Sequence, residues 1–199
     1  YDQILISSSA LSRMLSRRRI SEIAKLQGIS PEDTLIEFLL ASDGQAIVSL
    51  EVLSGKNVRD AIQHPFSIIS SNGAGYSEEH KKTGELVHPR SFGTFPKVLA
   101  LYVREEKVLS WEEAIFKMTG KPADKFHLEK RGKLIKGYAA DIIIFDPETI
   151  QDNATLEDPY QYATGIDEVF IGGESVLSGG LVQPLKRGRV LTSKKGWFQ

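Results

Sequence analysis

Strand-like and helical stretches alternate along the first 125 residues, and this alternation constrains the fold more than any other feature of the sequence. Three apolar runs have the composition of buried strands: residues 3–8, 46–53 and 66–70. Helical patterns are expected at residues 21–27, 31–40, 55–62, 93–104 and 111–118. Strands that alternate with helices predict parallel pairing through right-handed crossovers. Three parallel strands make a poor independent sheet, so we expect them to belong to a larger barrel or open sheet.

The pattern changes near residue 128. From there on, glycines separate three short β-like runs, which are residues 141–145, 168–171 and 174–177. Such spacing predicts a small antiparallel β unit. Gly172-Gly173 could suggest a phosphate-binding loop, but no helical pattern follows it, so we interpret the pair as a hairpin turn.

Composition limits the partners and the compartment. A net charge of −1 gives no general attraction to nucleic acid, and no apolar run is long enough to span a membrane, so neither partner is expected. The basic cluster of Arg13 and residues 17–19 is most simply a solvated loop or helix end. The chain has no cysteine, which excludes disulfides, thiolate metal sites and a cysteine nucleophile. This fits a reducing compartment, and we expect a cytoplasmic protein.

The third apolar run ends in Ser71-Asn72-Gly73. Chemistry in α/β enzymes usually lies at such strand ends. Asn72 is either a turn residue or stands where a catalytic acid would be, and the pattern alone leaves both interpretations open. The loop that follows contains His88-Pro89-Arg90, whose arginine could clamp a carboxylate with two parallel hydrogen bonds.

The other histidines are most simply structural. His64 precedes a proline at a helix-to-strand junction, His80 lies among charged residues at an expected solvated loop tip, and His127 follows a helix end. None of the histidines has His-x-His or His-Glu-x-x-His spacing. The sequence therefore predicts no self-contained metal site.

Four longer stretches resemble a known family. They are HPFSIISSNG (64–73), HPRSFGTFPKVL (88–99), LSWEEAIFKMTGKPA (109–123) and RGKLIKGYAADIIIFDP (131–147). In this order they resemble the C-terminal part of the D-aminoacylases (N-acyl-D-amino-acid deacylases) of the amidohydrolase superfamily, and the resemblance extends over nearly the whole chain.

The resemblance implies a TIM-type (β/α)8 barrel followed by a small β-sandwich. A barrel alone needs about 250 residues. We therefore expect residues 1–127 to be a C-terminal barrel segment of about three βα units, 128–190 a β-sandwich segment and 191–199 a tail. The start at Tyr1, without an initiator methionine, fits a piece of a longer protein.

The resemblance also implies site chemistry. Zinc in the family is held largely by residues of the first part of the barrel, and the last barrel strand ends in Ser-Asp-Gly, whose aspartate shuttles a proton. Asn72 stands at that position and would be at most a weak metal ligand, acting only with the missing N-terminal ligands. Arg90 matches the arginine that grips the substrate carboxylate, with Ser71, Gly73 and His88 as further substrate-binding residues. We expect zinc in the parent enzyme and none bound by this chain alone.

Two functions follow from the resemblance. The chain is a fragment of a metal-dependent hydrolase of N-acyl-D-amino acids, inactive alone and completed by the missing N-terminal barrel half or by self-association. Alternatively, it is part of a catalytically silent homologue that binds a ligand or partner, which the Asn72 replacement favours. A hydrolase of cyclic amides is a weaker third option, because HPRSFGTFPKVL matches the D-aminoacylases specifically.

Overall fold

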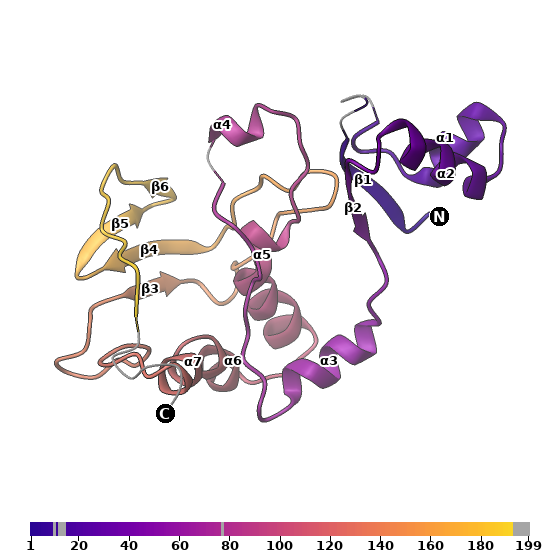
Figure 1. Ribbon diagram of the computed structural model, residues 1–199. Helices are drawn as coiled ribbons and strands as arrows, with labels where there is room; N and C mark the ends of the chain where they lie inside the picture. Colours follow the sequence, from indigo (N-terminus) through magenta and orange to yellow (C-terminus); the bar gives the residue numbers. More distant parts are fainter. Residues whose placement is uncertain (10, 12–14, 77, 193–199) are drawn as a thin grey trace. The chain divides into compact units, whose positions relative to one another are not determined.

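The computed structural model describes residues 1–9, 11, 15–76 and 78–192 (Figure 1). The chain forms two compact units, each built from three segments. Unit 1 comprises Tyr1–Ser54, Asn72–Phe92 and Ala154–Gln161, and unit 2 comprises Gly55–Ser71, Gly93–Asn153 and Tyr162–Gln199. The expected boundary between residues 127 and 128 falls inside unit 2 and remains a prediction.

Unit 1 contains a two-stranded sheet and two helices that pack together. Strand β1 (Ile4–Ser9) pairs with β2 (Ala46–Leu50), and helices α1 (Ile20–Gln27) and α2 (Pro31–Ala41) lie between them in sequence. A short helix, α4 (Glu78–Lys81), completes the unit. Its hydrophobic core consists of Ile6, Ile20, Ile23 and Phe38.

The expected parallel pairing of the first two strands is wrong. Strands β1 and β2 are antiparallel, with Ile4 opposite Leu50 and Ser9 opposite Ala46. The reason lies in the connection. A parallel pair needs a crossover, but here two successive helices return the chain to the end of the sheet at which it left. The alternation of elements was visible in the sequence, whereas the direction of the second strand was not.

Local capping signals explain the bounds of α1 and α2. Gly28 ends α1 in the left-handed region at φ 71°. Ser30 caps α2, because its Oγ accepts a hydrogen bond from the Asp33 backbone N–H at 3.0 Å, and Pro31 occupies the first turn. Both predicted helix ends are confirmed.

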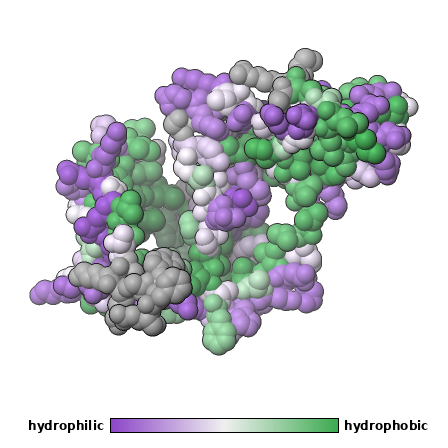
Figure 2. All heavy atoms as spheres, in the orientation of Figure 1, coloured by the Kyte–Doolittle hydropathy of each residue, from purple (hydrophilic) through white to green (hydrophobic). Residues whose placement is uncertain are grey.

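Much of the apolar surface of α1 and α2 is not covered. Figure 2 shows apolar side chains gathered on the face of the molecule around these helices. Leu26 and Leu40 are each 76% exposed and Ile36 is 55% exposed. Exposed apolar clusters of this kind usually mark an interaction surface.

Unit 2 is built around a pair of consecutive helical segments. Helix α5 (Arg90–Lys97), which enters the unit at Gly93, continues into a π-helix, η1 (Val98–Glu105). The other helices are α3 (Gly55–Gln63), α6 (Trp111–Met118) and α7 (Gly120–Lys125). The hydrophobic core of the unit consists of Val98, Leu99, Val103, Leu109, Ala114 and Ile150. No helix in the described ranges is both long and apolar enough to cross a bilayer.

A four-stranded antiparallel sheet belongs to the same unit. Its strands are β3 (Ile142–Phe145), β4 (Ile166–Ile171), β5 (Glu174–Ser178) and β6 (Leu181–Val182), in that order across the sheet. Gly172 and Gly173 form the β4–β5 turn with φ of 60° and 86°, a conformation that glycine adopts without strain. The predicted antiparallel β unit and its hairpin turn are confirmed.

The third expected strand does not form. Residues 66–70 form no strand and pair with no strand in the part of the chain that the structure describes. A strand requires a neighbouring backbone that satisfies its N–H and C=O groups, and apolar composition alone does not supply one. The parallel (β/α)8 barrel therefore remains a prediction.

Candidate functional site

Asn72 lies in an exposed loop and adopts φ of 45°. This left-handed region is uncommon for residues other than glycine, but asparagine and aspartate adopt it several-fold more often than most. This backbone angle is compatible with the turn interpretation of Asn72, which stays a prediction. Because an aspartate would tolerate the same backbone, the geometry is compatible with either side chain at this position.

Gly73 packs against Ser91, which joins the two ends of the loop formed by residues 72–92. A Cβ atom built on Gly73 would lie 2.8 Å from Ser91 Cα, closer than side-chain carbons approach. The Ala74 backbone N–H also donates to Ser91 Oγ at 3.3 Å. Asn72 and Arg90 are each one residue away from this contact. The contact thus brings together two regions that the sequence separates by 17 residues.

Arg90 is the first residue of α5, and His88 fixes the start of that helix. The Arg90 backbone N–H donates to His88 Nδ1 at 3.1 Å. Both residues are exposed, and the first turn of α5 contains no acidic residue. The N-terminus of a helix attracts anions, and a guanidinium does so as well. This arrangement is therefore suited to a carboxylate ligand.

Four aromatic rings pack together in unit 1, three of them from the loop of residues 72–92 and the fourth from Tyr160. Phe92 and Tyr160 meet edge to face with centroids 5.5 Å apart, and Tyr76 lies 6.4 Å from each of them. The fourth ring, His80, is 4.8 Å from Tyr76, and its Nε2 is 3.8 Å from Glu85. His80 is thus part of a packed cluster, and its prediction as a solvated loop tip is wrong.

Tyr160 anchors the loop and was missed by sequence reasoning. It is 8% exposed, and its hydroxyl donates to the Glu85 carbonyl at 3.2 Å. Burial raises the pKa of Tyr160, with smaller contributions from Tyr76 and Glu85. Next to this anchor, the Leu86 N–H donates to the Ser7 carbonyl on β1 at 3.0 Å. The loop is therefore a packed part of unit 1.

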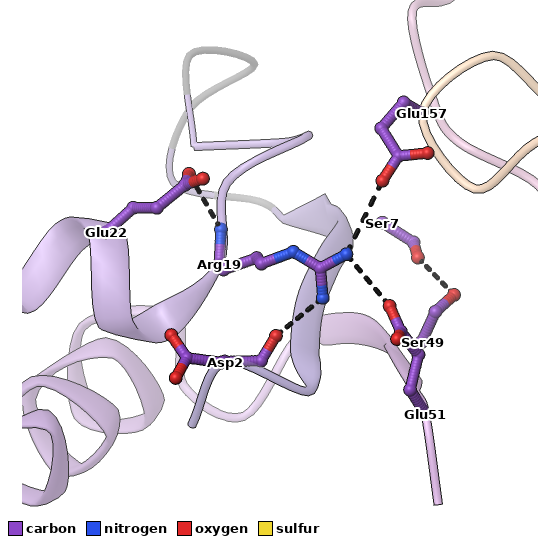
Figure 3. A network of polar contacts seen from close by, with 7 residues as sticks. All are labelled: Asp2, Ser7, Arg19, Glu22, Ser49, Glu51 and Glu157. Carbon is purple, nitrogen blue, oxygen red and sulfur yellow. Dashed lines mark hydrogen bonds and ion pairs between the residues drawn. The ribbon is translucent and has the colours of Figure 1, made fainter. Parts of the chain in front are cut away.

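Arg19 is the centre of a polar network in unit 1 (Figure 3). Its guanidinium donates to the Asp2 carbonyl at 2.5 Å and to Glu51 at 2.8 Å, and it lies 3.4 Å from Glu157. The hydrogen bond to Glu51 raises the pKa of Arg19. Arg19 precedes α1, as expected of a helix end, but its side chain also links the first segment of the unit to Glu157 in the third. Arg13 lies outside the described residues.

In unit 2, Asp152 and Arg104 hold the segment of residues 147–152 against the helical pair. The Asp152 carboxylate occupies the space that a Cβ on Gly93 would fill. Arg104 donates to the Ile150 carbonyl at 2.6 Å and to Gln151 Oε1 at 2.9 Å. Only glycine fits at position 93 without moving this carboxylate.

The described residues do not fit a zinc site on their own. They contain no group of three histidine, aspartate or glutamate side chains close enough to share a metal ion. His64 accepts a hydrogen bond from the Phe66 N–H at 3.2 Å, which agrees with a structural role at its junction. His127 adopts φ of 53° just beyond α7. Asn72 could offer an amide oxygen, which is a weaker metal ligand than a carboxylate.

Comparison with known proteins identifies close relatives. The model of a family described as "Amidohydrolase family" matches residues 10–177. The D-aminoacylase of Alcaligenes xylosoxydans xylosoxydans is 36% identical over 177 residues, which is 89% of this chain and 34% of that protein. The chain thus spans about a third of the length of this relative.

Solved structures of the same group superpose well. A crystal structure of D-aminoacylase matches with a TM-score of 0.81 at 34% identity, over 95% of this chain and 37% of that one. The N-acyl-D-glutamate deacylase from Bordetella bronchiseptica, solved with zinc and a phosphonate mimic of the tetrahedral intermediate, matches with a TM-score of 0.77 at 30% identity. It covers 94% of this chain and 36% of that one.

Proposed function

Because the chain belongs to the amidohydrolase family, we propose that it is the C-terminal part of a metal-dependent hydrolase that cleaves the amide bond of N-acyl-D-amino acids. The observation that carries this proposal is the contact between Gly73 and Ser91. It holds the loop at Asn72 beside the start of α5 at Arg90, so one ligand could meet both.

Arg90 is assigned the binding of the substrate's α-carboxylate. An arginine at a helix N-terminus offers a planar pair of donors and a favourable helix dipole to an anion. His88 supports this role by accepting the Arg90 backbone N–H. Ser71 and Gly73, which flank Asn72, are assigned to the same substrate pocket. The first turn of α5 contains no acidic residue, so no carboxylate within that turn offsets the attraction of the helix N-terminus for an anion.

Asn72 is assigned the position of the catalytic acid. A carboxylate there could take a proton from water and return it to the leaving amine, whereas an amide has no such proton-transfer chemistry near neutral pH. Asn72 can orient a substrate group or a water molecule by hydrogen bonding. Zinc would polarise the scissile amide in the complete enzyme. Its ligands would come from outside this chain, since the described residues do not fit a metal site.

We assign the chain to part of a (β/α)8 barrel with part of a β-sandwich. Two features favour a partner that completes it. Relatives are about three times longer, and Leu26, Ile36 and Leu40 expose apolar surface on α1 and α2. The missing barrel half or a second copy of the chain would cover this surface. Sedimentation of the isolated chain tests the assignment, and a stable monomer over a wide concentration range would contradict it.

A second function is favoured by Asn72 itself. A catalytically silent homologue would keep the carboxylate-binding end of the site, with Arg90 and His88, and lack the proton-transfer group. Such a protein would bind an N-acyl amino acid or a partner without turnover.

One experiment separates these functions. The full-length protein that contains this chain is assayed for zinc content, for hydrolysis of N-acetyl-D-amino acids and, by calorimetry, for their binding. Turnover supports the hydrolase and shows that Asn72 does not disable it. Binding without turnover supports the silent homologue. If the protein neither binds nor cleaves D-configured substrates, the proposed function is wrong.

A further inference from the structure

Lys117 on α6 is a buried lysine whose contacts all lie within unit 2. Its residue is 6% exposed. The ammonium donates to the His64 carbonyl at 2.6 Å and to Ser67 Oγ at 2.8 Å. The Lys117 carbonyl accepts a hydrogen bond from the Ile69 N–H at 3.2 Å. One residue thus contacts three points of the segment that leads to Ser71.

The burial of the Lys117 side chain needs a physical explanation. Lysines are almost never fully buried unless they are paired, because burial of a charge without compensation costs free energy. Desolvation lowers the pKa of Lys117, and nearby Lys121 lowers it further, with Glu113 opposing them. Lys121 itself donates to the Pro65 carbonyl. Two cations therefore bind successive carbonyls just beyond the end of α3, where the helix dipole favours positive charge.

Within the described part of the chain, the segment of residues 64–71 is not held in place by pairing with a strand. No described strand pairs with it, so no hydrogen-bond ladder fixes its backbone. The contacts that order it include the packing of Ile69 on the core, the Lys117 and Lys121 hydrogen bonds, a hydrogen bond from Ser67 Oγ to the Ile62 carbonyl at 3.1 Å and a local turn. In that turn, the Ser67 N–H donates to the His64 carbonyl at 3.0 Å and the Ser67 hydroxyl contacts the same carbonyl at 2.9 Å.

We propose that Lys117 is a positioning residue, whose ammonium fixes the conformation of residues 64–71 and thereby holds Ser71 for its role in the substrate site. The site role of Ser71 rests on the proposed function, whereas the fixing of the segment does not. Lys117 does not touch substrate in this account. It acts through the backbone that it binds.

Hydrogen exchange of the 199-residue chain tests the proposal. Lys117→Met removes the ammonium and keeps much of the apolar stem. We expect amide exchange in residues 66–71 to rise by on the order of tenfold, while exchange in strands β3 to β5 stays unchanged. Lys125→Met, on an exposed position of α7, is the matched control and should change neither region.

Chemical restoration of the ammonium makes the test specific. The chain has no cysteine, so Lys117→Cys can be alkylated selectively with 2-bromoethylamine in the unfolded state, which forms a thioether with release of bromide, and then refolded. We expect fast exchange in residues 66–71 before alkylation and slow exchange after it. If Lys117→Met does not fold, Ser67→Ala, which removes one acceptor of the ammonium, should raise exchange in the same segment.

Three outcomes would overturn the proposal. They are unchanged exchange in residues 66–71, an equal rise in strands β3 to β5, and no recovery after alkylation. A full-length protein that neither binds nor cleaves N-acyl-D-amino acids would instead overturn the proposed function and leave the exchange result standing. The two failures are therefore distinguishable.

Discussion

Gly73 and Ser91 lie in direct backbone contact, and a side chain on Gly73 would leave only 2.8 Å between its Cβ and Ser91 Cα. The contact closes the loop that separates Asn72 from Arg90. It explains why glycine stands at position 73, although the φ of this residue is not in the left-handed region. The space, and not the backbone angle, excludes a larger residue.

Gly73→Ala should therefore destabilise unit 1. The Cβ atom meets backbone, which cannot rotate away, so we expect a loss of about 1–3 kcal/mol in the free energy of unfolding. Gly75→Ala is the matched control, since nothing lies within 4 Å of its Cβ position. Urea denaturation of both variants measures the difference. Equal stability of the two would show that the contact is absent in solution.

Gly93→Ala should be destabilising for a different reason. Its Cβ would take the place of the Asp152 carboxylate, which then has to move. We expect the free energy of unfolding to fall by about 1–3 kcal/mol. When Gly93→Ala is combined with Asp152→Ala, the loss should be smaller than the sum of the losses in the two single variants. A double-mutant cycle by denaturation measures this coupling. Strict additivity would contradict the packing of Asp152 on Gly93.

These cases show what the sequence could predict. The caps at Gly28 and Ser30 and the turn at Gly172-Gly173 depend on neighbouring residues only, and local patterns identified them. The antiparallel pairing of β1 with β2 depends on which way two helices return the chain, which no local pattern contains.

The candidate site divides in the same way. The sequence singled out Asn72 and Arg90, but not the contact that makes them neighbours. Tyr160 and Lys117 were missed because their partners are 75 and 53 residues away. The one available signal was an apolar helix face interrupted by a lysine at position 117. Patterns of single residues do not reveal which distant carbonyl such a lysine binds.

The Arg59–Glu106 pair in unit 2 should make stability depend on pH. Arg59 Nε donates to Glu106 Oε2 at 2.7 Å, and this hydrogen bonding, opposed by desolvation, lowers the pKa of Glu106 from its ordinary value of 4.5. A carboxyl whose pKa is lower in the folded state than in the unfolded state stabilises the folded protein at pH values above the unfolded-state pKa. This stabilisation is lost as the pH falls through the folded-state pKa.

We therefore expect Glu106→Gln to be less stable than the original protein near neutral pH, with the difference vanishing well below pH 4.5. Thermal denaturation across this range measures it. Glu148→Gln, at an exposed position of the same unit, is the control and should show no such trend. A difference that persists unchanged in acid would contradict the ionic origin of the effect.

Arg90→Ala should weaken substrate binding in a catalytically active background of the full-length protein. Loss of a bidentate, charge-assisted contact predicts a rise in KM on the order of tenfold to a hundredfold, with a smaller effect on kcat. Arg90→Lys keeps the charge but not the planar pair of donors, so it should be intermediate. Lys97→Ala, exposed on the same helix, should leave KM unchanged. An unchanged KM in Arg90→Ala would refute the assignment.

The central claim is that Asn72 occupies the position of a catalytic acid in the site of an N-acyl-D-amino-acid hydrolase. The most direct measurement compares the rate of deacylation of an N-acetyl-D-amino acid by the full-length protein and by its Asn72→Asp variant, at equal zinc content. We predict that Asn72→Asp raises the rate by about two to four orders of magnitude, the range typical of general acid–base catalysis, from a level near background. Such a gain would also favour the silent homologue as the role of the unaltered protein. Efficient turnover by the original protein, with no gain in Asn72→Asp, would contradict the claim.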